Sequence, residues 1–308
     1  MKKVREQFDR FAKTYDQHSS FQDAAGGDLR RRLQESIPDR CHAQKPFALL
    51  DIGCGTGTQD QFLLNDWPDA KIYGVDLSVR MVQEALRKIQ APGFWVYCGT
   101  GERLALKGNV MDVVFSNLTL QWIDDLWSAA REISRVLKHE GIFIFNALGP
   151  KTLQELQSSV AELYPDIQTP RRFPSMPEMC LAFQQGGLVV KNISVEERTM
   201  EYPSFPELLH TIKGIGGNYP VMAGKKGLIT VRTMEKLEKV YRDHFGGDGG
   251  VPATFEIVWG IATKYDKTGG EIMLDPELLK VLACPECKGA LEVPEGENYL
   301  LCAHCRLK

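Results

Sequence analysis

Three glycines at alternate positions, Gly53, Gly55 and Gly57, directly follow the apolar run 47–52. Such a run predicts a strand that is buried on both faces of a sheet. Glycine adopts positive φ angles and lets the backbone approach a ligand closely. The residues after Gly57 predict the start of a helix, whose free N–H groups can face a polar ligand. The segment therefore predicts a loop that binds a small molecule.

Two carboxylates accompany this loop. Asp51 lies inside the end of the first predicted strand, and Asp76 ends the second, nineteen residues after Gly57. An acidic side chain in the position of Asp76 can accept hydrogen bonds from both hydroxyls of a ribose. The spacing differs from the G-x-G-x-x-G of dinucleotide-binding folds, because the third glycine comes one residue too early.

The pattern D-x-G-x-G-x-G resembles motif I of the class I S-adenosylmethionine (SAM)-dependent methyltransferases. This resemblance implies that SAM is the methyl donor. It places Asp51 and the three glycines at the amino-acid end of the cofactor, where a carboxylate can engage the positive charge directly or through water. Asp76 then binds the ribose.

The resemblance implies further cofactor contacts. Many of these enzymes carry an aspartate that binds the adenine amino group where this chain has Thr100, so Glu102 or backbone groups such as that of Gly101 are expected to compensate. Gln22 is expected to reach the cofactor from the N-terminal segment, and Asn117 to lie near the methyl group. Two residues, Leu77 and Met81, pack either on the adenine or within an ordinary core.

Composition excludes several classes of protein. The chain has 308 residues, of which 43% are hydrophobic and 25% are charged, with a formal net charge of −3. These values are typical of a globular protein and argue against one devoted wholly to nucleic acid. No apolar run has the length of a membrane span, and the N-terminus lacks the apolar core of a signal peptide. We therefore expect a cytoplasmic protein with reduced thiols.

Strand and helix patterns alternate from residue 47 onward, which predicts an α/β fold with parallel strands joined by right-handed crossovers. The resemblance sharpens this to a Rossmann-like, mostly parallel, seven-stranded sheet with a helical cap from about 1–40 and 201–250. The expected strands are 47–52, 71–75, 94–98, 111–116, 141–147, 188–200 and 251–264. Helices are expected within 1–40 and at 58–66, 78–89, 125–138, 151–164, 176–185, 204–213 and 232–245.

The C-terminus carries two C-x-x-C pairs, Cys284/Cys287 and Cys302/Cys305, separated by fourteen residues. Four thiolates at this spacing predict a closed, structural zinc site. A linker at 265–271 and a zinc-ribbon unit at 272–308 are expected after a methyltransferase domain at 1–264. The unit resembles the small zinc-binding partner proteins that activate methyltransferases of tRNA and translation factors. In those proteins a strand follows the last cysteine pair, whereas here only three residues follow, so we expect a shortened unit.

The acceptor is indicated by three other segments, residues 4–22, 115–125 and 208–218. Together with motif I they resemble the malonyl-acyl-carrier-protein O-methyltransferases of biotin synthesis over roughly residues 4–264. The resemblance implies methylation of the free carboxylate of a malonyl thioester. A carboxylate is already ionised at pH 7, so this reaction needs no general base, only positioning of the two reactants.

The acceptor side of the site has several candidates. Tyr15 and Trp122 are expected either next to the acceptor or within the aromatic core, and Lys213 is a candidate cation for its carboxylate. Acidic carrier protein could dock on a run of basic residues. The further candidates for these two roles are Arg171 and Arg172 for the carboxylate, and Arg30, Arg31, Arg32, Lys225 and Lys226 for docking.

Two other functions remain open from the sequence. The zinc tail allows a methyltransferase of tRNA or a translation factor, although residues 116–119 read Ser-Asn-Leu-Thr where amide-nitrogen methyltransferases carry N-P-P-Y/F. The second alternative is a SAM-binding assembly factor that does not methylate.

Overall fold

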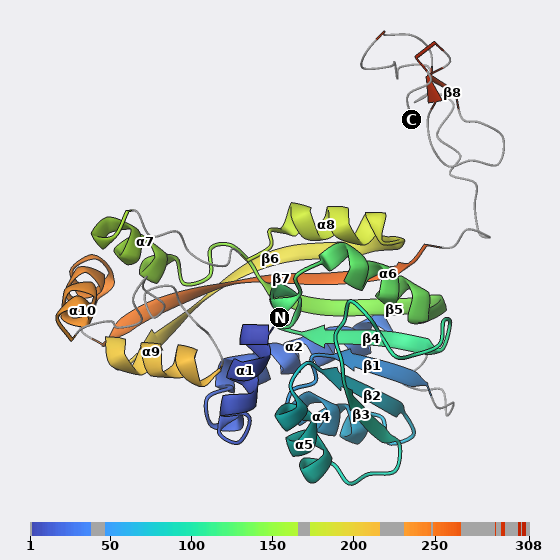
Figure 1. Ribbon diagram of the computed structural model, residues 1–308, viewed down its shortest axis with the longest axis horizontal. Helices are drawn as coiled ribbons and strands as arrows, with labels where there is room; N and C mark the ends of the chain where they lie inside the picture. The colour runs from blue at the N-terminus through green and yellow to red at the C-terminus, as the bar shows by residue number, and fades with distance from the viewer. Residues whose placement is uncertain are drawn as a thin grey trace. The chain divides into compact units, whose positions relative to one another are not determined.

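The computed structural model describes residues 2–37, 47–165, 173–215, 231–247 and 249–265, and in the tail residues 287, 291–292, 301–302 and 304–305. The chain divides into two compact units, Met1–Lys264 and Tyr265–Lys308 (Figure 1). Apart from Tyr265, the expected linker lies outside the described residues.

Seven strands of the first unit form one sheet in the order β3-β2-β1-β4-β5-β7-β6 (Figure 1). The first five strands are parallel, and β7 runs antiparallel to both of its neighbours. This confirms the mostly parallel seven-stranded sheet. The strands are β1 (Ala48–Ile52), β2 (Lys71–Asp76), β3 (Phe94–Cys98), β4 (Met111–Asn117), β5 (Leu137–Leu148), β6 (Leu188–Tyr202) and β7 (Val251–Lys264). The strand order reverses between β1 and β4, which is where such folds bind ligands.

Each face of the sheet is covered by helices. Leu49 and Leu50 are neighbours on β1 and point to opposite faces, and both are fully buried. Leu49 joins the core formed with α2 (Ser20–Ser36), α4 (Thr58–Asp66) and α5 (Val79–Lys88). Leu50 joins the core formed with α6 (Leu126–Val136) and α8 (Met176–Gln185). Burial on both faces explains why β1 reads as a continuous apolar run.

Further helices lie toward one end of the sheet. α9 (Phe205–Gly214) and α10 (Val231–Phe245) form an insertion between β6 and β7, and Phe205 packs on Tyr241 with ring centroids 4.9 Å apart. α7 (Gln154–Leu163) follows β5, while α1 (Lys2–Phe11) and the short 3₁₀ helix η1 (Tyr15–Gln17) precede α2. Within the described ranges, every helix is too short or too polar to cross a bilayer.

One predicted boundary is wrong. Residues 125–138 were expected to be helical and the next strand to begin at residue 141, but α6 ends at Val136 and β5 already begins at Leu137. Leu137 pairs with Met111, and the register shifts before the regular pairing of β4 with β5 resumes. Glu140 lies in the segment of β5 where the register shifts, and its backbone is left-handed there, with a φ of 61°. Pairing with the buried Met111 therefore makes Leu137 part of a strand, although the polar stretch Lys138–Glu140 that follows resembles a helix end.

Candidate active site

A pocket with about 710 Å³ of empty space, its open mouth included, lies at the carboxyl ends of β1, β2 and β4. Eleven residues that the sequence predicts for the site line it: Tyr15, Gly53, Gly55, Asp76, Leu77, Met81, Thr100, Gly101, Glu102, Asn117 and Trp122. Eight others were missed: Val4, Phe8, Ile52, Val75, Gly99, Leu118, Thr119 and Ile123.

The glycine loop between β1 and α4 is left-handed at all three glycines, with φ angles of 80°, 55° and 79°. A Cβ atom on Gly53 would lie 2.1 Å from Thr119 Oγ1, so no larger residue fits there. A Cβ on Gly55 would meet nothing within 4 Å, and Gly55 lines the pocket. The loop therefore leaves its backbone open to a ligand.

Asp76 fixes this loop to the end of β2. Its Oδ2 accepts a hydrogen bond from Gly55 N at 3.0 Å, and its Oδ1 accepts one from Ser78 N at 2.7 Å. Burial raises the pKa of Asp76 to about 6, although both backbone hydrogen bonds favour the charged form. Asp76 therefore lies where the sequence predicts a ribose-binding carboxylate.

Polar atoms without partners cluster near the glycine loop. Asp51 Oδ1, both carboxylate oxygens of Asp60 and Asn117 Oδ1 are buried and have no hydrogen-bond partner in the described part of the chain. Asp51 is 2% exposed, and Asp60, in the first turn of α4, is 0% exposed. Buried acceptors normally have partners, so these atoms fit a ligand that donates hydrogen bonds or carries positive charge.

Burial also changes the ionisation of this acidic pair. It raises the pKa of Asp60 to about 7. It raises the pKa of Asp51 well above its usual range, and the nearby charge of Asp60 raises it further. Two carboxylates in a site of low polarity cannot both ionise easily without a cation. Asp60 was not predicted as a site residue.

Three aromatic residues, Phe8, Tyr15 and Trp122, line the same pocket as Gly53 and Gly55 and form what we call the aromatic wall. The ring of Phe8 stands edge-on to Trp122 at 5.5 Å between centroids and lies 6.4 Å from that of Tyr15. Burial raises the pKa of Tyr15, and the carboxylates of Asp76, Asp23 and Asp16 raise it further. The Tyr15 phenol therefore keeps its proton and can donate a hydrogen bond.

The segment 2–19, which we call the N-terminal cap, is fastened to the sheet domain at two points. Asp9 Oδ1 accepts hydrogen bonds from Ser78 Oγ at 2.6 Å and Arg80 N at 3.3 Å. Asp16 accepts hydrogen bonds from Lys88 Nζ at 2.6 Å and Thr56 Oγ1 at 2.5 Å. These contacts hold the aromatic wall over the glycine loop.

The loop after β3 forms another wall. The Thr100 hydroxyl donates a hydrogen bond to the Glu102 carboxylate, and Glu102 N donates back to Thr100 Oγ1 at 3.0 Å. Glu102 Oε1 also accepts a hydrogen bond from Asp124 N at 3.0 Å. Glu102 thus supports Thr100 and also holds the segment that follows Trp122.

Several predicted residues lie elsewhere. Lys213 is exposed near the end of α9 and does not line the pocket, and no Lys, Arg or His is found among the lining residues that the structure describes. Gln22, Asp51 and Gly57 lie outside the lining, although the backbone oxygen of Gln22 accepts a hydrogen bond from Asn117 Nδ2 at 3.0 Å. Arg171, Arg172, Lys225, Lys226 and Cys284 lie outside the described residues.

The arginine run of α2 is engaged within the chain. Arg30 pairs with Asp66 at 2.7 Å, and Arg31 pairs with Asp28 at 2.9 Å. The guanidinium of Arg32 lies over the ring of Trp259 at 4.6 Å. Successive helical positions are 100° apart, so these side chains point in different directions and do not form one patch.

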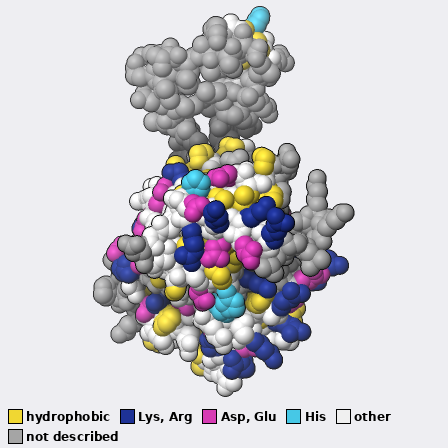
Figure 2. Space-filling view, turned by 90° about the vertical axis from the view of Figure 1, so that its left-hand side faces the viewer, with side chains coloured by type: hydrophobic (Ala, Val, Ile, Leu, Met, Phe, Trp, Pro, Cys, Tyr) yellow, Lys and Arg dark blue, Asp and Glu magenta, His cyan; other side chains and the backbone are white. Residues whose placement is uncertain are grey.

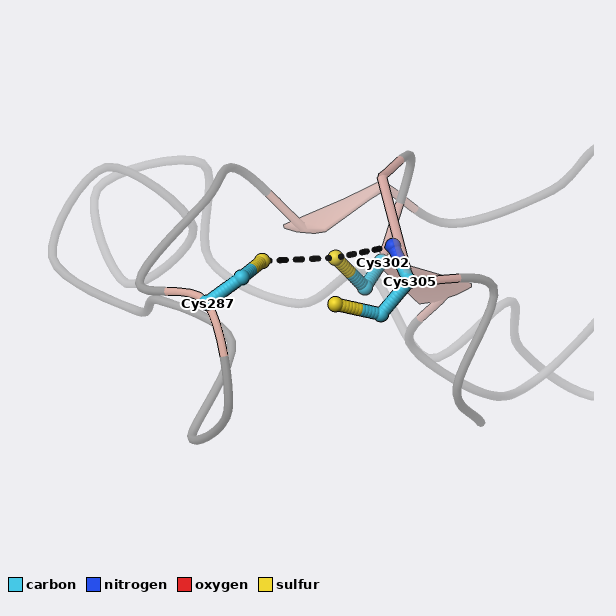
Figure 3. A group of neighbouring side chains, drawn as sticks. All are labelled: Cys287, Cys302 and Cys305. Carbon is cyan, nitrogen blue, oxygen red and sulfur yellow. Dashed lines mark hydrogen bonds between the residues drawn. The ribbon is translucent and has the colours of Figure 1, made fainter.

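The second unit brings three of the predicted zinc ligands together. The Sγ atoms of Cys287, Cys302 and Cys305 lie within 4.8 Å of one another (Figure 3). Cys302 Sγ lies 3.5 Å from Cys287 Sγ, and it accepts a hydrogen bond from Cys305 N at 3.3 Å. Strands β8 (Leu291–Glu292) and β9 (Leu301–Cys302) pair next to this cluster. Three convergent thiols fit a tetrahedral zinc site with Cys284 as the predicted fourth ligand.

Comparison with known proteins shows which enzyme family this chain resembles. A family described as "Methyltransferase domain" matches residues 50–145. The malonyl-[acyl-carrier protein] O-methyltransferase of Halorhodospira halophila is 33% identical over 285 residues, which cover 88% of this chain and 92% of the relative. The enzyme of the same name from Geobacter sulfurreducens is 31% identical over 272 residues, covering 85% and 98%. The chain belongs to the malonyl-[acyl-carrier protein] O-methyltransferase family. Its membership confirms the prediction of a SAM-dependent methyltransferase.

Two further matches bear on the fold and the tail of this family member. The solved structure of the YcgJ protein of Bacillus subtilis aligns with a TM-score of 0.53 at 18% identity, covering 77% of this chain and 99% of YcgJ, so the two share a fold. A family described as "Trm112p-like protein" matches residues 275–308. This agrees with the predicted resemblance of the tail to small zinc-binding partner proteins.

The pocket of this methyltransferase fits SAM. The amino-acid end of SAM carries an ammonium group, and Asn117, which lines the pocket, offers a buried oxygen without a partner in the described residues. Asp51 and Asp60 lie outside the lining and add negative charge near the glycine loop. Gly55 leaves space for the backbone to approach a ligand, and Asp76 lies at the end of β2. The carboxylates and the amide oxygen therefore match the positive charge of the cofactor.

SAM affinity is expected to rise with pH. In the free enzyme the raised pKa values of Asp51 and Asp60 mean that the folded state binds more protons than the unfolded chain. These two groups therefore lower the stability of the folded state as pH rises from about 4 to about 7. An ammonium favours the ionised carboxylates, so binding releases protons. If Asp60 alone is responsible, affinity rises about 25-fold between pH 5.5 and 7.5. Calorimetry in two buffers of different ionisation enthalpy measures the released protons.

The control for this pH effect is Asp60→Asn, which removes the titratable carboxyl group and keeps the shape of the side chain. We expect the variant to bind SAM with a much flatter pH profile. Equal proton release by the variant and the native enzyme would show that Asp60 does not ionise when SAM binds.

Removing one zinc ligand gives a second expected outcome. Cys302→Ser should lower the zinc content from about one atom per chain to nearly none after dialysis against a chelator, because a structural site needs all four thiolates. Cys180→Ser is the matched control, since Cys180 lies on α8 and is not part of the cluster. Atomic emission measures the metal, and full zinc retention by Cys302→Ser would contradict the site.

Proposed function

We propose that the chain transfers a methyl group from SAM to the free carboxylate of a malonyl thioester carried by acyl-carrier protein, an early step of biotin synthesis. Membership in the family supports this acceptor, since the relatives are named for it. The observation that supports the proposal is the pocket itself, whose lining includes Gly53, Gly55 and Asp76 as well as Tyr15 and Trp122.

The proposed roles follow this arrangement. Residues 1–264 form the catalytic domain and residues 272–308 a zinc ribbon. Gln22, Asp51, Gly53, Gly55 and Gly57 hold the amino-acid end of SAM, Asp76 the ribose, and Leu77, Met81, Thr100, Gly101 and Glu102 the adenine. Asn117 is assigned to the methyl group of SAM, and Tyr15 and Trp122 to the acceptor. We also propose a cytoplasmic location, as expected from the sequence.

Bound SAM supplies an electrophilic methyl group: the carboxylate oxygen bonds to its carbon while the sulfur leaves with the electron pair, so no proton moves. The chain has to orient the carboxylate and exclude water from it. The neutral phenol of Tyr15 suits this task, because it can donate a hydrogen bond to the carboxylate oxygen that is not methylated. Positioning of this kind can lower a barrier by roughly 7–11 kcal/mol.

The test uses the full chain with SAM and purified carrier proteins. Mass spectrometry of malonyl-acyl-carrier protein is expected to show the gain of one methyl group, whereas acetyl-acyl-carrier protein gains none because it has no free carboxylate. Bulk tRNA serves as a further control, since the Trm112p-like tail is the feature that favours an acceptor from translation. Methylation of tRNA but not of the malonyl carrier would overturn the proposal.

A further inference from the structure

The outer side of α1 and the residues just after it carry a group of free cations, which we call the N-terminal basic patch. It consists of Lys2, Lys3, Arg5, Arg10 and Lys13. All five side chains are exposed, and none has an ion pair within the described part of the chain. Of the two acidic residues in this stretch, Glu6 is exposed, whereas the carboxylate of Asp9 accepts hydrogen bonds from Ser78 Oγ and Arg80 N.

The patch lies at the pocket. Val4 and Phe8 are four residues apart on the opposite side of α1, and both line the pocket wall. The contact of Asp9 with the start of α5 fixes the helix in this orientation. It also brings Arg80, which is exposed, next to the patch. A protein bound to the outer side of α1 would thus lie within a short distance of the site of methyl transfer.

The patch contrasts with the rest of the molecule. Residues 2–13 contain five basic and two acidic residues, a net charge of +3, whereas the whole chain has −3, which leaves −6 for the remainder. Figure 2 shows another side of the molecule, on which Lys and Arg side chains are interspersed with Asp and Glu across the middle of the face and along its lower right edge. Of the two basic runs that the sequence offers for docking, Arg30–Arg32 is engaged within the chain, and Lys225–Lys226 lies outside the described residues. The N-terminal basic patch therefore has positive charges available to a partner, whereas the arginines of α2 are already paired or packed within the chain.

We propose that the N-terminal basic patch is the docking surface for the acidic carrier protein. This inference rests on the proposed function, because that function supplies the carrier. The malonyl group is attached to its carrier by a short prosthetic arm, so the carrier has to bind close to the pocket mouth. Exposed charges of this kind attract an acidic partner over a distance and raise its rate of association, and salt screens the attraction.

An acidic protein fits the patch better than a nucleic acid does. Nucleic-acid binding needs several phosphate contacts along an extended basic surface. Here the cations are confined to the ten-residue helix α1 and to Lys13 just after it, and the remaining chain, at −6, repels a long polyanion. A compact acidic protein that contacts only α1 and its surroundings avoids this repulsion.

The test reverses three charges of the patch in the full chain, as Lys2→Glu, Lys3→Glu and Arg10→Glu together. Binding is measured directly, by anisotropy of a fluorescently labelled acyl-carrier protein, so that it does not depend on methylation. We expect the dissociation constant to rise at least tenfold in the triple variant at about 50 mM salt. Native binding should weaken by a similar factor when salt is raised tenfold. SAM affinity and thermal stability should match those of the native chain.

The control makes the same change of net charge elsewhere. Lys71, Lys107 and Lys191 are exposed, none lines the pocket, and all three are changed to Glu. This variant should bind the carrier like the native chain. Equal loss of binding in both triple variants, or no loss in either, overturns the proposal, as does a native chain that binds tRNA at this patch but no carrier. Carrier binding without methylation would instead count against the proposed function alone.

Discussion

Gly53→Ala is expected to lower the affinity for SAM roughly 100-fold, which isothermal calorimetry measures. Gly53 has a φ of 80°, and an added Cβ would lie 2.1 Å from Thr119 Oγ1. Forcing a residue with a side chain into this region costs on the order of 1–3 kcal/mol, and the clash with Thr119 adds to this. The loop can relieve the clash only by moving away from the position in which it faces the pocket.

The control for this substitution is Gly27→Ala. Gly27 lies within α2, and its added Cβ would meet only Arg30 Nη2, at 4.0 Å. Because the Gly53 variant could also lose stability, Asp76→Asn provides a second test that keeps the side-chain shape and removes a carboxylate from the pocket. If both folded variants bound SAM as tightly as the native chain, the glycine loop and Asp76 would not form the cofactor site.

Trp122→Ala should lower kcat/KM for the malonyl acceptor about 100-fold while changing SAM affinity less than threefold. Trp122 lines the pocket beside Tyr15 and packs edge-on against Phe8. Its removal frees the acceptor to leave the orientation that the reaction needs, and a misplacement of about 1 Å can cost 10²-fold. Initial rates with varied acceptor at saturating SAM separate this effect from cofactor binding.

Trp127→Ala is the matched control for that loss. Trp127 is 41% exposed on α6, where the guanidinium of Arg131 lies over its ring at 4.7 Å, and it does not line the pocket. We expect it to retain native rates. An equal loss of activity in both tryptophan variants would point to a general effect on folding, and full activity in Trp122→Ala would remove Trp122 from the acceptor site.

The sheet could be predicted from the sequence because burial leaves a strong local pattern. Residues 47–52 are apolar without interruption because β1 is buried on both faces, and the glycines that follow have φ angles that other residues rarely adopt. The start of β5 could not be predicted. Its first residue, Leu137, is held in the sheet by Met111, a partner 26 positions away, whereas Lys138–Glu140 resembles a helix end.

Most of the predicted residues that line the pocket belong to sequence motifs, whereas the lining residues that the sequence missed depend on packing. Val4 and Phe8 read as the apolar face of a helix, but which surface they cover is decided by contacts such as that of Asp9 with Ser78. Asp60 is a polar residue in the first turn of a helix, a position that is usually exposed. Only the fold reveals that it is buried close to Asp51.

The position of the transferred methyl group tests the central claim most directly. The native chain is incubated with methyl-labelled SAM and malonyl-acyl-carrier protein, and the isolated carrier is then treated with an esterase. A methyl ester on the malonyl carboxylate should release the label as methanol, and the carrier should return to the mass of the malonyl form. Label that stays on the carrier after complete ester hydrolysis, or that never reaches it, would contradict carboxylate methylation by this site.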